Sequence, residues 1–459
     1  MVARDGDDRG PQRHRPGAAR RRRGRRPRLR FLQCHGLPAA PGPRGAHGRR
    51  RRRSLRGDRR SRETGQLDHQ GRLMVSFSPA LARLRYQWTA GTGAWARGHR
   101  LWAGLPGRRF ASVLSTVPDR SLSLAYQGLP AGLTYILPYL TEQQSALAGR
   151  VSTVAGPAVT WRQLRHASPD ADLVALGCSR RRALALPSAH SVLLPFRVHQ
   201  LLDIVGDAEA MHKTVSANER RQFAKLRRKY EWTAELGTGE EDLRFFYERM
   251  HLPTMASRHG GSARSVDLDV ATHELFHKGR LLFVTEGEKR VAGVLARLED
   301  GGKVMRMRLL GVLDGDETHY RSGAVKAVYY LAMEWAAGNG VSRIDFSSAD
   351  PYPGKGVFQF KRRFHPTLVH AENHYRDYRV HLRAKRDTPL VRDLLVATPM
   401  LTVDSADRLV AVHFFDGTRP AKENIRGDGP GVHATRLVDL DEFLAGLPVT
   451  PPTERTTRR

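Results

Sequence analysis

The chain has 459 residues, 40% of them hydrophobic, which is enough for the cores of two or three domains. Its two cysteines, Cys34 and Cys178, exclude a disulfide framework and lead us to expect a reducing, cytoplasmic setting. No run of about 18 apolar residues occurs, so no segment is predicted to cross a membrane as a helix.

The formal net charge of +31 is concentrated near the start of the chain. Residues 1–73 hold 23 Arg, no Lys and 6 acidic residues, a net charge of +17. With so few periodic apolar residues, this segment cannot offset its ordering entropy, and we expect it to be disordered. Two interpretations stay open: a tail that binds nucleic acid or an anionic surface, or a start assigned upstream of the true one at Met74.

Residues 74–205 are expected to form an N-terminal α/β half. Residues 131–140 are predicted as a strand or a membrane-facing turn, and residues 173–178 and 191–196 as strands. Residues 211–230 predict a helix that carries cations on most faces. That charge fits either a solvated helix or a platform for a polyanion such as a nucleotide-linked precursor or tRNA.

Residues 281–364 form the stretch around which the rest is organised. Residues 281–285 and 291–297 predict two strands joined by a turn, and residues 303–312 predict a third. The period of two in the third strand places Arg306 and Arg308 on one face, which we expect to be solvated and basic, opposite a core face.

A helix and a further strand follow. From Tyr320, apolar residues recur at spacings of three and four, which predicts a helix that ends at Gly338 to Gly340, before a strand at 341–348. The amides at the start of this helix, near Arg321, Ser322 and Gly323, are predicted to hold a phosphate.

One motif points to different chemistry. His273-Glu274-Leu275-Phe276-His277 fits the pattern H-E-x-x-H, in which two histidines bind zinc and the glutamate activates water. A strand is predicted only three residues later, and no further histidine follows at the usual spacing. A zinc metallohydrolase is therefore the lesser alternative, and no metal is expected.

Several short motifs, taken in order, resemble the CelD-like and Fem-type (FemAB-like) branch of the GNAT superfamily over residues 165–380. The resemblance implies a GNAT-like α/β fold, with a mixed central sheet, flanking helices and two tandem halves, the first abbreviated. Residues 206–380 would be the acyltransferase half and residues 381–459 a C-terminal extension with a disordered end. The motifs are His199-Gln-Leu-Leu-Asp-Ile, Ser216-Ala-Asn-Glu-Arg-Arg-Gln-Phe, Asp242-Leu-Arg-Phe-Phe-Tyr, Tyr320-Arg-Ser-Gly-Ala, Trp335-Ala-Ala-Gly-Asn-Gly and Gly356-Val-Phe-Gln-Phe-Lys-Arg-Arg-Phe.

The resemblance also implies an N-acyltransferase that moves an acyl group from an acyl-CoA co-substrate to an amine of a small molecule or an envelope precursor. Ordinary GNAT enzymes have Gln or Arg three residues before the glycine of the pyrophosphate loop, whereas here Tyr320 stands three residues before Gly323. The alternative donor is therefore an aminoacyl-tRNA, as in Fem-type synthesis of peptidoglycan precursors. A nucleic-acid-binding module without transfer activity is a third class, and the oligomeric state is left open.

The candidate site residues follow from this chemistry. Asp345 and His319 are candidate bases for the acceptor amine, although each also suits a structural role. Lys361 occupies the Phe-Lys position that the resembling family uses near its active site, where a cation would steady a carbonyl oxygen or a donor phosphate.

The remaining candidates bind the two substrates. Backbone amides of a bulged or splayed strand are expected to hold the oxyanion, and the helix start to hold the donor. These residues are Leu309, Leu310 and Gly311 on the strand, and Arg321, Ser322, Gly323 and Ala324 at the helix start. Arg306 and Arg308 are expected to face the same cleft from the strand.

Overall fold

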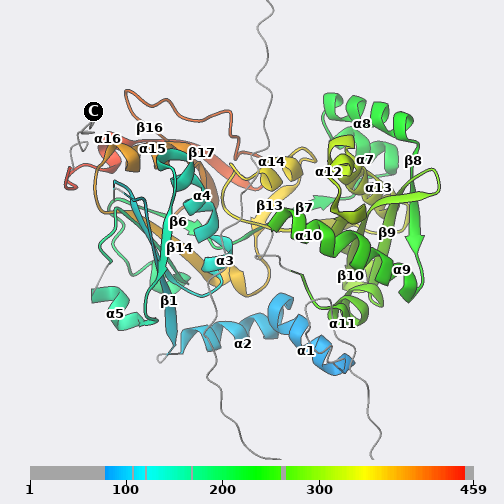
Figure 1. Cartoon of the computed structure of the whole chain (residues 1–459), viewed down its shortest axis with the longest axis horizontal. Coiled ribbons are helices and arrows are strands. Elements are labelled where there is room, and N and C mark those ends of the chain that lie inside the picture. The colour runs from blue at the N-terminus through cyan, green and yellow to red at the C-terminus, as the bar shows by residue number, and fades with distance from the viewer. Residues whose placement is uncertain (1–77, 106–107, 119–120, 167–168, 260–264, 450–459) are drawn as a thin grey trace, which may run out of the picture. The chain divides into compact units, whose positions relative to one another are not determined.

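The structure, a computed structural model, describes residues 78–449 except 106–107, 119–120, 167–168 and 260–264 (Figure 1). The expectations for residues 1–73 and for the chain after Thr450 therefore lie outside the described residues. Within the described part, the chain is a mixed α/β protein with three sheets. No helix there is both long and apolar enough to traverse a bilayer.

The first sheet has the strand order β3-β1-β2-β5-β14-β6, with β4 paired to β1. Only β2 and β5 run parallel among its pairs. The predicted strands at 173–178 and 191–196 are β5 and β6. Its strands are β1 (Arg109–Thr116), β2 (Ser123–Gly128), β3 (Ser152–Ala155), β4 (Val159–Thr160), β5 (Leu173–Ser179), β6 (Ser191–Pro195) and β14 (Tyr378–Ala384).

Residues 131–140 are helical, so their prediction as a strand or turn was wrong. They form α3 (Gly132–Tyr135) and the start of α4 (Leu137–Ala148). Ile136, Leu137, Tyr139 and Leu140 are buried, a spacing that suits one face of a helix against the sheet. Pro138 lies in the first turn of α4, where a proline costs no hydrogen bond.

The other helices of this half are α1 (Pro79–Ala90), α2 (Gly93–Gly104), α5 (Trp161–His166) and α6 (Arg180–Ala183). A third sheet of order β15-β16-β17 follows late in the chain. It consists of β15 (Met400–Val403), β16 (Leu409–Phe415) and β17 (Val432–Asp439), with α15 (Pro389–Ala397) and α16 (Leu440–Phe443).

The second sheet has the order β13-β7-β12-β11-β10-β9-β8, in which only β11 and β12 run parallel. The predicted strands at 281–285, 291–297 and 303–312 are β9, β10 and β11. The domain boundaries stay a prediction, although β7, from the expected N-terminal half, is an inner strand here. The strands are β7 (Val198–Asp203), β8 (Trp232–Gly237), β9 (Gly279–Glu286), β10 (Lys289–Glu299), β11 (Val304–Val312), β12 (Arg343–Ala349) and β13 (Thr367–His370).

Helices cover both faces of this sheet, which explains the continuous apolar runs of β9 and β10. Leu282 and Val284 pack with α13, whereas Leu281 and Phe283 pack with α1 and the helices between β8 and β9. The helices between β8 and β9 are α9 (Glu240–Phe245), α10 (Leu252–His259) and α11 (Leu268–Val270), with π-helical turns at Phe246–His251 and Ala271–Phe276. The other helices of this half are α7 (Ala208–Thr214), α8 (Ala217–Tyr230), α12 (Glu317–Ser322), α13 (Ala324–Gly338) and α14 (Gly356–Arg362).

Two predicted helices are each divided. Residues 211–230 form α7 and α8, because the Ser216 hydroxyl caps a new helix through the Glu219 amide at 3.4 Å. The helix predicted from Tyr320 is α12 and α13, since Gly323 between them has φ +95. The apolar stripe of α13 is confirmed, with Ala324 and Val328 buried.

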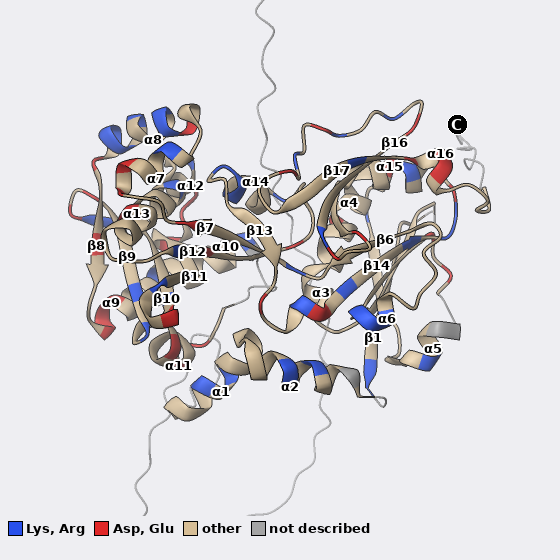
Figure 2. Cartoon of the chain, turned by 180° about the vertical axis from the view of Figure 1, so that it is seen from behind, with Lys and Arg blue, Asp and Glu red and all other residues tan. Residues whose placement is uncertain are grey.

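Basic side chains gather on α8 (Figure 2). Arg227 pairs with Glu334 of α13 at 2.6 Å, and the one acid of α8, Glu219, pairs with Lys326. Four exposed cations of α8 have no ion pair among the described residues, and these are Arg221, Lys225, Arg228 and Lys229. The exposed charge of α8 is therefore compatible with both alternatives, a solvated helix and a platform for a polyanion.

Candidate functional site

The second sheet opens where β11 and β12 part. Their parallel pairing ends with Arg306 opposite Asp345. Beyond that point β12 carries an irregularity, because its register against β7 shifts between Asp345 and Ser348. Ser347, inside the irregularity, has φ +63, and its hydroxyl donates to the Met307 carbonyl. A non-glycine residue held at positive φ is costly, and such residues concentrate at functional sites.

A second bulge lies on β11. Its register against β10 shifts so that Leu295 faces Leu309 and Ala296 faces Met307, which leaves Arg308 as the extra residue. A bulge increases the local twist of a strand and redirects it. The bulge at Arg308 therefore lies between the last residue paired with β12, Arg306, and the residues Leu309, Leu310 and Gly311, which were expected to hold the oxyanion.

Backbone groups of β11 line this opening, because the N–H and C=O of one residue point to the same edge of a strand. The Leu310 carbonyl accepts from His251 Nδ1 at 3.0 Å, and the Val312 amide donates to Thr254 Oγ1 at 2.9 Å. By the same alternation, the Leu310 amide faces the opening, whereas those of Leu309 and Gly311 face β10.

Gly311 has a packing role at this point. A Cβ there would lie 2.5 Å from the Met250 carbonyl carbon and 2.6 Å from the His251 nitrogen. Only glycine lets the π-helical turn Phe246–His251 approach β11 this closely. That approach positions His251 beside the Leu310 carbonyl.

A row of polar side chains crosses the sheet beside the opening. Ile344 and Phe346 pack in the core with α13, so Asp345 between them points to the other face. There, Asp345 Oδ2 lies 2.9 Å from His199 Nδ1 of β7 and 3.2 Å from Arg306 Nε of β11.

Asp345 stays ionised despite being 1% exposed. Burial raises its pKa, but His199, Arg306 and the Ser347 amide outweigh burial and lower the pKa below its ordinary value. A carboxylate of this kind is a weak base. It is well suited to orient the His199 imidazole and to stabilise it when charged.

The expected solvated, basic face of β11 was wrong. Arg306 is 3% exposed and pairs with Glu299 at 3.0 Å as well as with Asp345. Tyr86 of α1 covers this face, with its hydroxyl 3.3 Å from Glu299 and its ring under the Arg308 guanidinium. Alternation placed both arginines on one face correctly, but a helix far upstream removes that face from solvent.

Lys361, on α14, is buried against β12. Its Nζ donates to the Phe346 carbonyl at 2.5 Å. Burial lowers its pKa to about 8, with Asp345 and Asp350 raising it and Arg197 lowering it further. An ammonium has three donors, and the Phe346 carbonyl occupies one of them. The structure thus brings the charges of Lys361 and Asp345 close enough to interact, on either side of Phe346.

The predicted donor seat is the junction of α12 and α13. The Ser322 hydroxyl donates to the His319 carbonyl at 3.0 Å, the Arg321 side chain is 80% exposed, and Ala324 is buried. A Cβ at Gly323 would lie 3.2 Å from Leu226 of α8, so α8 packs closely there.

His319 also lies on α12, half-buried. Among the described residues, no hydrogen bond or ion pair joins its side chain, or the residues of the junction, to Asp345 or Lys361. The structure therefore brings Asp345, Lys361 and Arg306 together and leaves His319 apart from them.

The glutamate of the H-E-x-x-H motif forms ion pairs. Glu274 is 1% exposed and pairs with Lys278 and, at 2.7 Å, with Arg297. Burial raises its pKa, but these two cations outweigh burial and lower it. The glutamate is thus committed to a buried ion-pair network. Within the described part of the chain, no three potential ligands gather as a metal site would require.

Sequence reasoning missed two residues as site candidates. His199 lies in one of the motifs on which the family resemblance rests. Nothing in the sequence of this apolar strand indicates that His199 pairs with Asp345, which is 146 positions away. Arg197, two residues earlier, pairs with Asp350, contacts Ser348 Oγ at 2.6 Å and lies 4.0 Å from the Tyr135 ring centre. Alternation of polar residues along this strand was the available signal.

Comparison with known families gives one match. Residues 213–362 match the family described as an acetyltransferase (GNAT) domain. That range holds β8 to β12, α8, α13, Asp345 and Lys361. No curated protein matches the chain.

Solved structures give weaker likenesses. A structure of FemX is 12% identical, with 66% of this chain and 96% of that chain covered and a TM-score of 0.32. L-PGS from Bacillus licheniformis is also 12% identical, covering 70% and 96%, with a TM-score of 0.32. A GCN5-related N-acetyltransferase from Sphaerobacter thermophilus is 16% identical, covering 67% and 94%, with a TM-score of 0.28. At scores this low, none of the three bears on the function of this chain.

Proposed function

We propose, from the match of residues 213–362 to the acetyltransferase (GNAT) domain family, that the protein transfers an acyl or aminoacyl group from a carrier to an amine acceptor. The observation that carries the proposal is the parting of β11 and β12 beside the buried trio of His199, Asp345 and Arg306. An extended donor would enter between the strands with its reactive carbonyl near the bulges. This arrangement supplies the parts that acyl transfer requires.

We assign the acceptor's proton to His199. An ammonium must lose a proton before its nitrogen attacks a carbonyl, and a neutral imidazole accepts one near neutral pH. The Asp345 carboxylate accepts a hydrogen bond from His199 Nδ1, so Nε2 is the nitrogen left to take the proton. The imidazolium that forms is stabilised by the same carboxylate.

The tetrahedral oxyanion needs donors already in place. The Leu310 amide, on the open edge of β11, is our candidate for one of them. Lys361 is the candidate cation, because it is buried, carries a positive charge below pH of about 8, and has donors beyond the one given to Phe346. The carrier's thiol or ribose hydroxyl then leaves as the intermediate collapses, and the acceptor gains an amide bond.

Two donors fit this chemistry. Acyl-CoA is the usual donor of the GNAT family and would place its pyrophosphate at the junction of α12 and α13. An aminoacyl-tRNA is favoured by two observations. Four exposed cations of α8 have no ion pair in the part of the chain that the structure describes, and Tyr320 stands three residues before Gly323, where ordinary GNAT enzymes have Gln or Arg. We rank acyl-CoA first, because residues 213–362, which match the GNAT family, include the junction of α12 and α13.

The test is a donor comparison with purified full-length protein. Acetyl-CoA and a charged tRNA are each titrated, and binding is followed by calorimetry. Acyl-CoA binding that is weakened by Gly323→Val and unaffected by Arg221→Gln supports the first donor. The reverse pattern with charged tRNA supports the second. If neither donor binds more tightly than about 1 mM, the transferase proposal is abandoned.

A further inference from the structure

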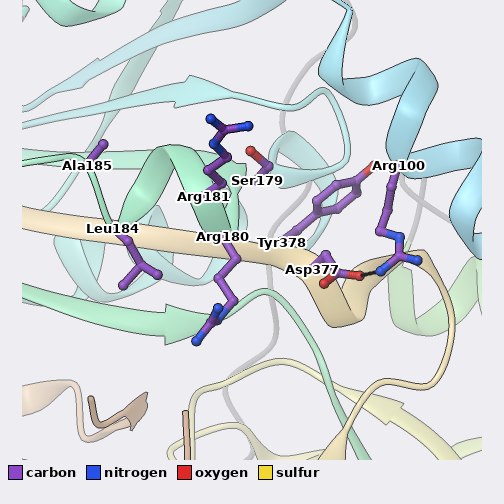
Figure 3. A pocket seen from close by; sticks show the side chains of 8 residues that line it. All are labelled: Arg100, Ser179, Arg180, Arg181, Leu184, Ala185, Asp377 and Tyr378. Carbon is purple, nitrogen blue, oxygen red and sulfur yellow. Dashed lines mark hydrogen bonds and ion pairs between the residues drawn. The ribbon is translucent and has the colours of Figure 1, made fainter. Parts of the chain in front are cut away.

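A pocket of about 480 Å³ lies outside residues 213–362, among elements of the first sheet (Figure 3). It is lined by Arg100 of α2, Arg180 and Arg181 of α6, Asp377 just before β14, and Tyr378, the first residue of β14. Its volume is in the range of pockets that hold small organic ligands, roughly 300–1,000 Å³. None of these residues has a part in the transfer chemistry proposed above.

The pocket has more positive than negative charge. Arg100 pairs with Asp377, the one carboxylate in the lining. Arg180 lies 3.4 Å from Asp407, which is already held by Arg379 at 2.6 and 2.8 Å. Two guanidiniums of the lining therefore lack a full counter-charge, and an anionic ligand would be attracted.

Arg181 is the least engaged of the three arginines. It is exposed, and no ion pair to it is found among the described residues. Figure 3 shows Arg180 and Arg181 leaving α6 in opposite directions, so they would contact different parts of a ligand. Arg180 Nε is buried and faces Asp407 Oδ1 at 3.4 Å, a contact that does not meet hydrogen-bond geometry, so the rest of the Arg180 guanidinium is what a ligand would contact. A ligand oxygen on the pocket side would supply acceptors to guanidiniums that the fold leaves short of them.

Neutral donors complete the lining. Ser179 lies at the end of β5, and the Tyr378 oxygen is 3.0 Å from His99 Nδ1. Burial raises the pKa of Tyr378, so the phenol is protonated and can donate. Burial, followed by the charge of Arg108, lowers the pKa of His99, so this imidazole is neutral near pH 7. Beside the arginines, the pocket is thus lined by the uncharged hydroxyl groups of Ser179 and Tyr378, which do not repel an anion.

We propose that this pocket binds the phosphate or diphosphate group of a small organic phosphate. Guanidinium groups bind phosphate oxygens in paired hydrogen bonds, and each of the two arginines offers such a group from its own side of the pocket. The exposed Leu184 and neighbouring Ala185 form an apolar wall for the organic part of the ligand. A nucleic-acid backbone is less suited, because its many phosphates call for an extended surface rather than a pocket of this size.

The experiment is hydrogen–deuterium exchange on the full chain with and without inorganic pyrophosphate, read at the peptides that cover residues 177–186. A local readout is needed, because the 23 arginines of residues 1–73 would also attract pyrophosphate. We expect protection of these peptides, with the half-saturating concentration raised about tenfold in Arg181→Gln. Arg221→Gln on α8 removes another exposed arginine that makes no ion pair within the described residues; it is the matched control and should change the half-saturating concentration less than twofold.

A second arm uses vesicles that contain an anionic phospholipid, to separate a lipid headgroup from a soluble phosphate. Protection by either probe that depends on Arg181 supports the assignment and identifies the source. Absence of protection with both probes, or equal protection in wild type and Arg181→Gln, overturns it. Because the readout is binding at 177–186, these outcomes are independent of whether the protein transfers acyl groups.

Discussion

Asp345 keeps its charge in a buried position because three neighbours compensate for the loss of water: His199, Arg306 and the Ser347 amide. A carboxylate held so firmly has little tendency to take a proton from a substrate. Its value lies in fixing the orientation of the His199 imidazole. The division of roles between a buried acid and the adjacent imidazole leads to the first prediction.

Removing the imidazole should remove the base. In His199→Ala we expect kcat to fall about 10²- to 10³-fold with a smaller change in KM, the usual cost of losing a general base. His319→Ala, which removes the other candidate, should stay within about threefold of wild type on the same scale. Steady-state kinetics of both variants decides between them, with thermal unfolding as the check on folding. A larger loss in His319→Ala would assign the base to α12 instead.

Lys361 should make activity depend on pH. Burial, first among the causes, lowers its pKa from 10.5 to about 8. If the cation steadies the oxyanion, kcat should fall as pH rises through about 8. Lys361→Met should be slower than wild type at pH 7 and lack this alkaline limb. A rise of kcat through pH 8 in the wild type would show that the neutral amine is the active form.

The same residue makes a prediction for stability. Because its pKa is lower in the folded state, the unfolded chain binds more protons between about pH 8 and 10.5. The destabilising effect of burying the ammonium is therefore fully present below pH 8 and is relieved as pH rises toward 10.5. Denaturant unfolding of wild type and Lys361→Met should show the wild type gaining stability relative to the variant over this range. A constant difference would contradict the lowered pKa.

At the scale of elements, the junction of α12 and α13 depends on a backbone conformation. Gly323 has φ +95, and Leu226 of α8 lies 3.2 Å from where its Cβ would be. Gly323→Ala should therefore destabilise the protein by about 1–2 kcal/mol.

Gly338 is the matched control, since it ends α13 with nothing within 4 Å of a Cβ and no positive φ. Gly338→Ala should be neutral or stabilise by up to about 1 kcal/mol. Chemical denaturation measures both variants. Equal effects at the two positions would mean that the junction does not require its left-handed residue.

The splay of β11 and β12 is likewise a property of elements. Bulges at Arg308 and between Asp345 and Ser348 turn the two strands apart immediately after their last pair. The π-helical turn Phe246–His251 then occupies the far end of β11 through Gly311. The opening is thus bounded by backbone features, which side-chain substitutions in the lining should alter little.

For the whole molecule, net charge is the property that residues 1–73 dominate. Deleting them lowers the formal charge from +31 to +14 and should reduce the salt dependence of binding to any polyanion, because fewer counterions are released. We expect kcat with small substrates to be unchanged in a chain that starts at Met74. Filter binding to RNA at several salt concentrations, beside kinetics, measures both. A loss of kcat would give residues 1–73 a part in the reaction.

Much of the order of elements was accessible from local pattern. The strand β11 repeats at a period of two and the apolar stripe of α13 at three to four, whereas β9 and β10 are marked by continuous apolar runs because both their faces are covered. Lys361 and Asp345 were found through a family resemblance and through their place at strand and helix ends. Residues 131–140 were misassigned because a short apolar run with Pro and Gly carries no clear period, and burial against the first sheet decided in favour of helix.

The amino-acid sequence by itself determined the charge, the distribution of apolar residues and hence the α/β core around residues 281–364, because these depend on neighbours in the chain. Only the tertiary structure decided that Arg306 is buried, that His199 is hydrogen-bonded to Asp345, and that Glu274 forms ion pairs with Arg297 and Lys278. Each of these depends on a partner brought across strands by pairing and bulges. Partners distant in sequence leave no periodic trace, so chemistry that rests on them becomes visible only once the sheet is assembled.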